Sequence, residues 1–329
     1  MQFGVSLFSY QEQYYRRQLT LDGCLAAAKS AGAAGIEMLA DQMVPGYPSI
    51  TYNLDEAFVT EWQQSLSRYQ LDPISFDIYG ESKLLKLRPT TEEELAEQLI
   101  VLIRTGKALG FKIFRINFLV PLSVIEMLVP HAERMDVLLA IEVHAPHRLS
   151  GSWVQGTLEI KERLKTRHLG IMPDFGTFCR RIPGLVLAEA RRKGVREDII
   201  ELAEDAYHSD ASRKTLFDRV EERNGSEEEL WLAKRVEIGV WINDDIADLK
   251  DLLPHCVHAH GKFYEMTDDL VEPDVRYDEI MPVLRDGGYT GFVMSEYEGQ
   301  RLNQGTDPGY DEIEQVRRHQ KMMRSFVNG

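Results

Sequence analysis

Short β-type segments alternate with longer amphipathic helical segments along almost the whole chain, and this alternation constrains the fold most strongly. It is typical of parallel sheets, in which a crossover helix follows each strand. We predict eight strands, at Phe3–Ser9, Gly35–Leu39, Asp72–Ile78, Ile113–Phe118, Leu138–His144, Leu169–Asp174, Cys256–Lys262 and Gly291–Glu296. Eight strands that are each followed by a helix favour a closed (β/α)8 barrel of the α/β class, and an open doubly wound sheet is the alternative.

The helical segments begin after residues that can cap a helix. Thr20, Asn53 and Thr91 are of types that accept hydrogen bonds from the free N–H groups of a first turn. The helices predicted from these starts are Leu21–Ala31, Leu54–Tyr69 and Glu92–Leu109, and a final helix at about Asp311–Val327 would close the ring. We therefore expect residues 1–329 to form a single barrel domain, a length that barrels with insertions reach.

One long segment, from about 177 to 254, interrupts the alternation between the sixth and seventh strands. A plain return to the next strand needs far less chain. The helical pattern of the segment falls in four stretches, at Leu185–Lys193, Arg196–Ala206, Arg213–Glu222 and Glu227–Lys234. The insertion is either an extra helical layer packed on the barrel or a lid or partner surface, and the sequence leaves both open.

Composition disfavours several partners. The net charge of −15 disfavours nucleic acid, because phosphate contacts need concentrated Lys and Arg. No apolar run reaches the roughly 18 residues of a membrane span, so we expect no membrane partner. The first residues read as a strand rather than a signal peptide, and Cys24, Cys179 and Cys256 form no paired zinc motif. Both observations lead us to expect a cytoplasmic protein.

Polar residues occupy the carboxyl ends of the last four predicted strands, where a buried strand normally avoids them. Residues i and i+2 of a strand share a face, and the carboxyl ends of barrel strands surround the active site. The candidates are Glu142 and His144 on the fifth strand, Asp174 on the sixth, His258, His260 and Lys262 on the seventh, and Glu296 on the eighth. We expect these side chains to meet at one end of the barrel.

Ionised carboxylates and imidazoles that share one buried space need compensation. Three carboxylates and a neutral imidazole suit a divalent cation, and a set dominated by oxygen favours Mn²⁺, Co²⁺ or Mg²⁺ over a thiolate-type zinc site. We predict one divalent metal ion, Mn²⁺ in the first place, with Glu142, Asp174, His260 and Glu296 as its ligands. The alternative for each residue is a salt bridge or a cap at the end of its strand.

Four short motifs resemble the xylose-isomerase-like TIM barrels, a family that includes sugar isomerases, ketose 3-epimerases and sugar-phosphate isomerase/epimerase homologues. The motifs are IEVHAP with Glu142, MPDFG with Asp174, HAH with His260 as its second histidine, and SEYEG with Glu296. The resemblance implies that these residues hold one metal and that the two glutamates relay protons at a sugar carbon. Thr177 and Met266 stand where the family's epimerases carry histidine and arginine, which disfavours simple ketose 3-epimerase activity.

Within this family, the chain is also similar to the larger, alpha subunit of bacterial C-glycoside deglycosylases. The similarity lies in the chain length, the opening GVSLFSYQEQYY and the segment IEVHAPH. It implies a small β-rich partner subunit and a substrate whose sugar carries a 3-keto group. The bond cleaved would be the carbon–carbon bond between sugar and aromatic aglycone, and His144 would resemble the catalytic base.

We expect a carbohydrate or a glycoside as the substrate. The residues predicted to contact it are Glu37, Arg115, His258 and Lys262. Glu37 stands where the family often has an acid near the end of the second strand, and Lys262 could hold a charged substrate group. Salt bridges inside the barrel, or a surface position for Lys262, are the alternative.

Both resemblances imply one chemical core. A metal acts as a Lewis acid on a sugar carbonyl or hydroxyl while a base removes a proton from the adjacent carbon. Our leading prediction is a sugar isomerase or epimerase with Glu142 and Glu296 as bases, and the alternative is a carbon–carbon lyase with His144 as base. A non-catalytic sugar-binding subunit is a third interpretation. We also expect an oligomer, because barrels of this family usually assemble.

Overall fold

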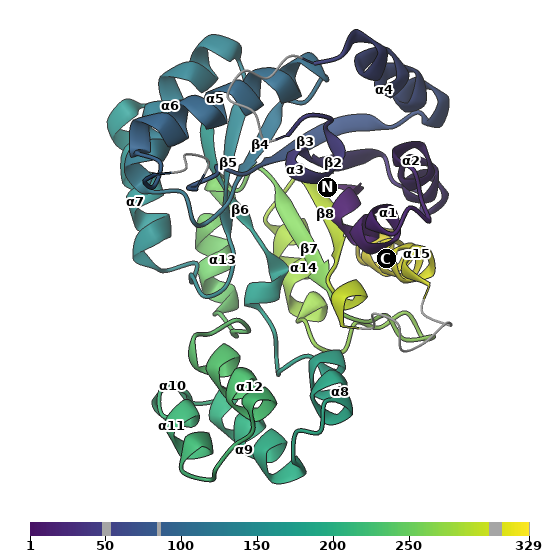
Figure 1. The fold of residues 1–329 in the computed structure, drawn as a ribbon. Coiled ribbons are helices and arrows are strands. Elements are labelled where there is room, and N and C mark those ends of the chain that lie inside the picture. Colours follow the sequence, from purple (N-terminus) through teal and green to yellow (C-terminus); the bar gives the residue numbers. More distant parts are fainter. Residues whose placement is uncertain (48–53, 84–86, 303–310, 329) are drawn as a thin grey trace.

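The computed structural model describes residues 1–47, 54–83, 87–302 and 311–328, and within them eight parallel strands form one sheet (Figure 1). The strands are β1 (Gln2–Ser6), β2 (Gly35–Leu39), β3 (Asp72–Ile78), β4 (Ile113–Ile116), β5 (Leu138–Val143), β6 (Leu169–Pro173), β7 (Ala259–Phe263) and β8 (Phe292–Tyr297). Their order is β6-β5-β4-β3-β2-β1-β8-β7, so that β6 and β7 are the two ends of the ladder.

The two ends of this sheet meet and nearly close the ring. Parallel bridges join Ile171 to Cys256 and Asp174 to His260, and the backbone N–H of Val257 donates to the carbonyl of Ile171 at 3.0 Å. The predicted (β/α)8 barrel is therefore confirmed, and the open doubly wound sheet is wrong. The first and fourth strands end earlier than predicted, because Leu7–Tyr10 form a 3-10 helix and residues 117–118 lie in a turn. The seventh strand begins later, at Ala259, because Cys256 pairs only through its isolated bridge.

The helices alternate with the strands as expected. They are α1 (Gln11–Tyr15), α2 (Leu21–Ser30), α3 (Ala40–Met43), α4 (Glu56–Tyr69), α5 (Glu92–Ala108), α6 (Leu122–Met135), α7 (Ser152–Leu164), α8 (Gly184–Arg192), α9 (Glu197–Tyr207), α10 (Asp210–Arg213), α11 (Leu216–Glu221), α12 (Glu227–Glu237), α13 (Ile246–Leu252), α14 (Tyr277–Asp286) and α15 (Glu312–Asn328). None of the described helices is long and apolar enough to cross a membrane.

Side-chain caps start several of these helices. The Thr20 hydroxyl accepts from the N–H of Gly23, and Thr91 and Glu94 form a reciprocal capping box, as their residue types predict. The helix α4 begins later than expected, with Asp55 as its cap, and Asn53 lies outside the described residues.

Strand register places the polar residues of neighbouring strands side by side. The backbone pairing aligns Ser6 with Glu37 and Glu37 with Ser75 across β1, β2 and β3. It also aligns Lys262 with Glu296 across β7 and β8. Because paired residues on parallel strands lie at the same height in the barrel, the register brings these side chains to a common level.

The insertion folds as a group of helices, α8 to α12, that stands beside the barrel at the β6–β7 seam, in teal and green in Figure 1. Its helices share buried apolar residues such as Ile199, Val220 and Leu232. Backbone hydrogen bonds join the two ends of the insertion to each other, from Asp244 to the carbonyl of Thr177 and from Cys179 to the carbonyl of Ile242. The predicted helical insertion between the sixth and seventh strands is confirmed.

The helix α5 packs against the barrel through a glycine. A Cβ added at Gly106 would lie 2.5 Å from Cδ1 of Phe76 and 2.6 Å from Cε1 of Phe114, and both rings are fully buried. We expect Gly106→Ala to lower the free energy of unfolding by about 1–3 kcal/mol, although alanine favours a helix, because the rings have no room to move.

Gly156→Ala in α7 is the matched control. Its added Cβ would meet only the tip of the half-buried Leu122 side chain, which can rotate away. Denaturant unfolding of both variants measures the difference. An unchanged midpoint for Gly106→Ala would contradict the close approach of α5.

Candidate active site and metal centre

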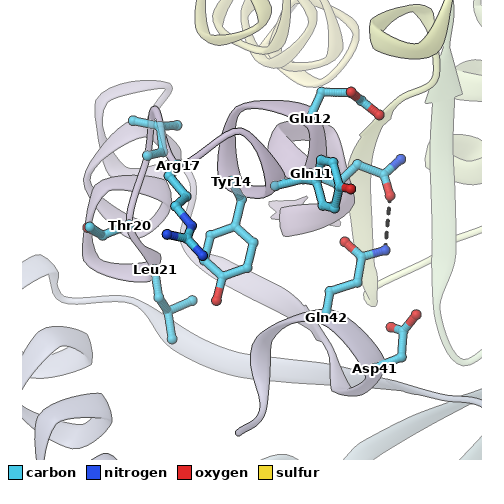
Figure 2. Close-up of a pocket in the computed structure, with 10 residues that line it drawn as sticks. Gln11, Glu12, Tyr14, Arg17, Thr20, Leu21, Asp41 and Gln42 are labelled. Carbon is cyan, nitrogen blue, oxygen red and sulfur yellow. Dashed lines mark hydrogen bonds between the residues drawn. The ribbon is translucent and has the colours of Figure 1, made fainter.

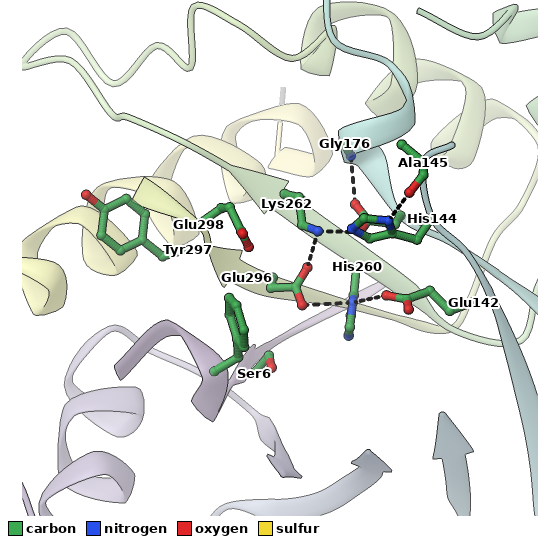
Figure 3. Close-up of polar contacts among 12 residues, drawn as sticks. Ser6, Glu142, His144, Ala145, Gly176, His260, Lys262, Glu296, Tyr297 and Glu298 are labelled. Carbon is green, nitrogen blue, oxygen red and sulfur yellow. Dashed lines mark hydrogen bonds and ion pairs between the residues drawn. The ribbon is translucent and has the colours of Figure 1, made fainter. Parts of the chain in front are cut away.

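Three buried residues bring one ligand atom each to a common point at the carboxyl ends of the strands. Glu142 of β5, His260 of β7 and Glu296 of β8 place these atoms within 4.8 Å of one another. The Nδ1 atom of His260 lies 3.2 Å from Oε1 of Glu142 and 3.2 Å from Oε1 of Glu296 (Figure 3). We call these three residues the triad.

The triad has the properties of a cation site. Oε1 of Glu142 and Nδ1 of His260 are buried without a hydrogen-bond partner among the described residues, and Oε2 of Glu296 has only an ion pair with Lys262 at 3.4 Å. Buried polar atoms are seldom left unpaired, and those that are need an explanation, such as an ion. Two carboxylates, which are hard donors, and one imidazole, which is a borderline donor, fit a divalent metal of the predicted kind.

A carboxylate behind His260 fixes the orientation of its ring. Nε2 of His260 lies 2.8 Å from Oε1 of Glu37, which can only accept, so the proton is on Nε2 and the lone pair on Nδ1 points into the triad. Glu37 also accepts from the hydroxyls of Ser6 and Ser75, both at 2.7 Å. Burial alone would raise the pKa of Glu37, but His260 lowers it to about 2, so Glu37 is ionised.

The surrounding carboxylates attract a positive charge to the triad. Burial lowers the pKa of His260, yet Glu296 and Glu37 together raise it well above its usual value. Without a metal, a proton on Nδ1 would supply the charge that the glutamates require. A bound cation would take the place of that proton, as expected for a metal ligand.

Arg115 of β4 forms an ion pair with Oε2 of Glu142, the carboxylate oxygen that does not face His260. Its guanidinium lies 2.7 Å from Oε2 of Glu142 and also pairs with the buried Asp77. Burial opposes ionisation of Glu142, but Arg115 and the neighbouring histidines lower the pKa of Glu142 far below its usual range. Oε1 of Glu142 is therefore left to face the triad.

Asp174 and Lys262 form a buried ion pair beside the triad. Nζ of Lys262 lies 2.7 Å from Oδ2 of Asp174 and 3.4 Å from Oε2 of Glu296, while Oδ1 of Asp174 accepts from the N–H of Gly176. Burial opposes the charge on Lys262, but both carboxylates raise its pKa. Asp174 thus lies next to the three triad atoms rather than among them, and its role as a fourth ligand stays a prediction.

His144 presents a free ring nitrogen to the site. Its Nδ1 is hydrogen-bonded to the carbonyl of Ala145, which can only accept, so the proton is on Nδ1 and Nε2 carries the lone pair. The ring stacks on Phe118 with centroids 5.2 Å apart. Nε2 stays 3.8 Å from Asp174, beyond hydrogen-bond distance, and the side chain is 27% exposed, so a substrate can reach it.

His258 lies deeper than the other candidates. It is fully buried, and its Nε2 lies 2.9 Å from the hydroxyl of Ser75. Burial lowers the pKa of His258 to about 4, so the ring is neutral. Its contacts place it with Glu37 and Arg115 in the layer that supports the triad, and its predicted substrate contact stays a prediction.

A cavity of about 150 Å³ opens between the barrel and the insertion. The barrel contributes His144, Lys262, Tyr264, Glu298, Arg301 and Leu302 to its wall, and the insertion contributes Val186, Arg235, Val240 and Trp241. The insertion is therefore part of the wall of the site, which favours the lid interpretation. Strand periodicity gave no signal for Arg235 or Arg301, because both lie outside the strands.

A larger cavity of about 940 Å³ lies beside the first two strands, lined by residues of α1 and α3 and of the loop between α1 and α2 (Figure 2). The amide groups of Gln11 and Gln42 lie 3.0 Å apart across it. None of the described lining residues belongs to the triad or the groups that support it. We therefore place the chemistry in the smaller cavity, whose wall includes His144 and Lys262.

Neutral amides at the triad should weaken metal binding. We expect the wild type to bind about one equivalent of Mn²⁺ and Glu142→Gln or Glu296→Gln to lose it, because an amide carries no charge. Glu298→Gln, which changes a carboxylate outside the triad, is the matched control. Metal analysis after gel filtration gives the stoichiometry, and full metal content in both triad variants would refute the site.

Glu37→Gln tests the carboxylate behind His260. We expect roughly a 10–100-fold weaker affinity for Mn²⁺, since the ring loses the acceptor that orients it. Isothermal titration calorimetry measures the affinity, and circular dichroism checks the fold. An unchanged affinity would show that Glu37 is not needed to orient His260.

The sequence is similar to those of two curated proteins over nearly its whole length. The sequence is 28% identical over 98% of the chain, and 94% of the relative, to the 3'-dehydrocarminate deglycosidase alpha subunit of a Microbacterium species. It is 26% identical to a C-glycoside deglycosidase alpha subunit of Arthrobacter globiformis, over 98% of this chain and 89% of the relative.

A crystal structure of D-psicose 3-epimerase from Clostridium cellulolyticum superposes with a TM-score of 0.58 at 12% identity, covering 100% of this chain and 99% of the epimerase. These named relatives are enzymes, as predicted for this chain. The model of the xylose isomerase-like TIM barrel family matches residues 25–326, and the chain belongs to that family.

Proposed function

We propose that this chain is the catalytic subunit of a C-glycoside deglycosidase, a carbon–carbon lyase that acts on a 3-keto sugar joined to an aromatic aglycone. The observation that carries the proposal is the free Nε2 of His144, which faces the cavity beside the triad. Two relatives that match over nearly the whole chain are named as alpha subunits of such enzymes, which supports it.

The triad would hold the sugar end of the substrate. A divalent metal on Glu142, His260 and Glu296, which we propose to be Mn²⁺, would polarise the keto oxygen or a neighbouring hydroxyl. Lys262 lines the cavity and is kept protonated by Asp174 and Glu296, so its ammonium can stabilise negative charge on a substrate oxygen.

His144 would then remove the proton from the sugar carbon that lies between the keto carbon and the anomeric carbon. The electrons of this C–H bond form a double bond to the anomeric carbon. The bond from the anomeric carbon to the aglycone breaks with its electron pair, and the aglycone carbon takes the proton back from His144. The products are the free aglycone and an unsaturated keto sugar, so the step needs no oxidant and no water.

A sugar isomerase or epimerase is the second candidate. Glu142 and Glu296 lie at equal distances from Nδ1 of His260, an arrangement that could relay protons at one sugar carbon. The hydroxyl of Thr177 donates its hydrogen bond to the carbonyl of Asp174. Met266 is buried and apolar. Neither residue offers a polar group to a ketose, which favours the lyase.

The alpha-subunit names of the relatives also bear on assembly. We propose that the chain works in the cytoplasm with a small, β-rich partner subunit, in a hetero-oligomer. Co-expression with a candidate small subunit, followed by gel filtration, tests this assembly.

His144→Gln separates the two candidates. We expect it to lower kcat for cleavage of a 3-keto aryl C-glucoside by about 10²–10⁴-fold while Mn²⁺ binding is kept, because glutamine cannot accept the proton. The assay uses the Mn²⁺-loaded chain with its partner and follows the free aglycone by chromatography.

His147→Gln, a change of the next histidine in the same loop, is the control and should cost only a few-fold in rate. If the wild type epimerises free ketoses and leaves the C-glucoside intact, the lyase is wrong and the second candidate holds. Full cleavage by His144→Gln would remove His144 as the base.

A further inference from the structure

Arg235 of α12 is a cation in the cavity wall without a carboxylate partner. Its guanidinium makes no hydrogen bond or ion pair with any residue that the structure describes. Its guanidinium carbon instead lies 4.5 Å from the ring centroid of Trp231 and 4.7 Å from that of Trp241. The charge therefore lies against two indole rings.

This arrangement fixes the guanidinium and leaves its donors unused. Cation–π contacts compensate the faces of the planar group, whereas its N–H bonds point outward from the edges. Arg235 is partly buried, and this burial lowers the pKa of its guanidinium. An orientated and partly desolvated guanidinium is well suited to bind a carboxylate through two parallel hydrogen bonds.

The other charges of the cavity do not supply that carboxylate. Asp174 and Glu296 already pair with Lys262. Glu298 lies 3.9 Å from Arg301. Among the described lining residues, Lys262 and Arg301 thus have carboxylate partners, and Arg235 is the cation that has none.

We propose that Arg235 is a specificity-determining residue that binds an acidic group, a carboxylate in the first place, on the aromatic aglycone. The proposal rests on the proposed function, which places the sugar at the barrel wall with His144 and Lys262. The aglycone then extends toward the insertion wall, where Arg235 and Trp241 offer a positive charge and an aromatic surface.

A purely structural role for Arg235 makes a different prediction. If the arginine only packs the two indoles together, its replacement would affect acidic and neutral ligands alike. A binding role affects the acidic ligand selectively. The ratio of the affinities for matched acidic and neutral ligands therefore separates the two roles.

The first experiment titrates the Mn²⁺-loaded full chain by calorimetry with 2,4-dihydroxybenzoate and with 2,4-dihydroxybenzamide. We expect the wild type to prefer the acid and Arg235→Gln to lose roughly 10–100-fold of that preference, as for a hydrogen bond to a charged group. Arg235→Lys should keep part of it, because lysine retains the charge without the planar fork.

Lys234→Gln is the matched control on the same helix. Lys234 pairs with Glu237 at 2.9 Å and lies over Phe217, and it is not among the residues that line the cavity. Its replacement should leave the ratio unchanged. Equal binding of acid and amide by the wild type, or an equal loss of both in Arg235→Gln, would overturn the proposal.

A second experiment compares cleavage of two 3-keto aryl C-glucosides that differ only in a carboxylate or carboxamide on the aglycone, with the partner present. If the acid is bound selectively but neither C-glucoside is cleaved, the anion site is supported and the lyase activity is rejected. If both substrates are cleaved and Arg235→Gln does not change the ratio of their cleavage rates, the lyase activity is supported and the role of Arg235 is rejected.

Discussion

The contact between His260 and Glu37 is the constraint on which the rest of the site depends. The barrel buries several ionisable groups at one level, and such groups are costly unless each has a partner. Glu37 accepts a hydrogen bond from the Nε2–H group of His260, so that Nδ1 is the atom that faces Glu142 and Glu296. The two serines that anchor Glu37 come from the neighbouring strands, which makes the geometry of the triad a property of strand register.

The barrel and the insertion contribute different things to the site. Strand ends supply groups that are rigid, buried and paired, which suits the binding of a metal and the movement of a proton. The insertion supplies Arg235 and Trp241, which lie on the other wall of the cavity. Under the proposed function, chemistry and recognition would be carried by separate parts of one chain.

Much of the barrel could be predicted from the sequence, because alternation of strand and helix patterns is a local signal that all eight strands carry. The gathering of the strand-end residues was also predictable, since i and i+2 positions and parallel topology determine it. The pairing of Asp174 with Lys262, in contrast, depends on side-chain distances that no pattern contains. Arg235 was beyond prediction because its position follows from how the insertion docks.

The seam between β6 and β7 has a consequence for variation among relatives. Those two strands meet through isolated bridges, and the insertion leaves and re-enters the barrel there. Its length and sequence can therefore change while the pairing of the remaining strands, from β6 round to β7, stays the same. Ligand preference could then change through the insertion while the residues at the strand ends stay the same, and the two parts of the site could evolve separately.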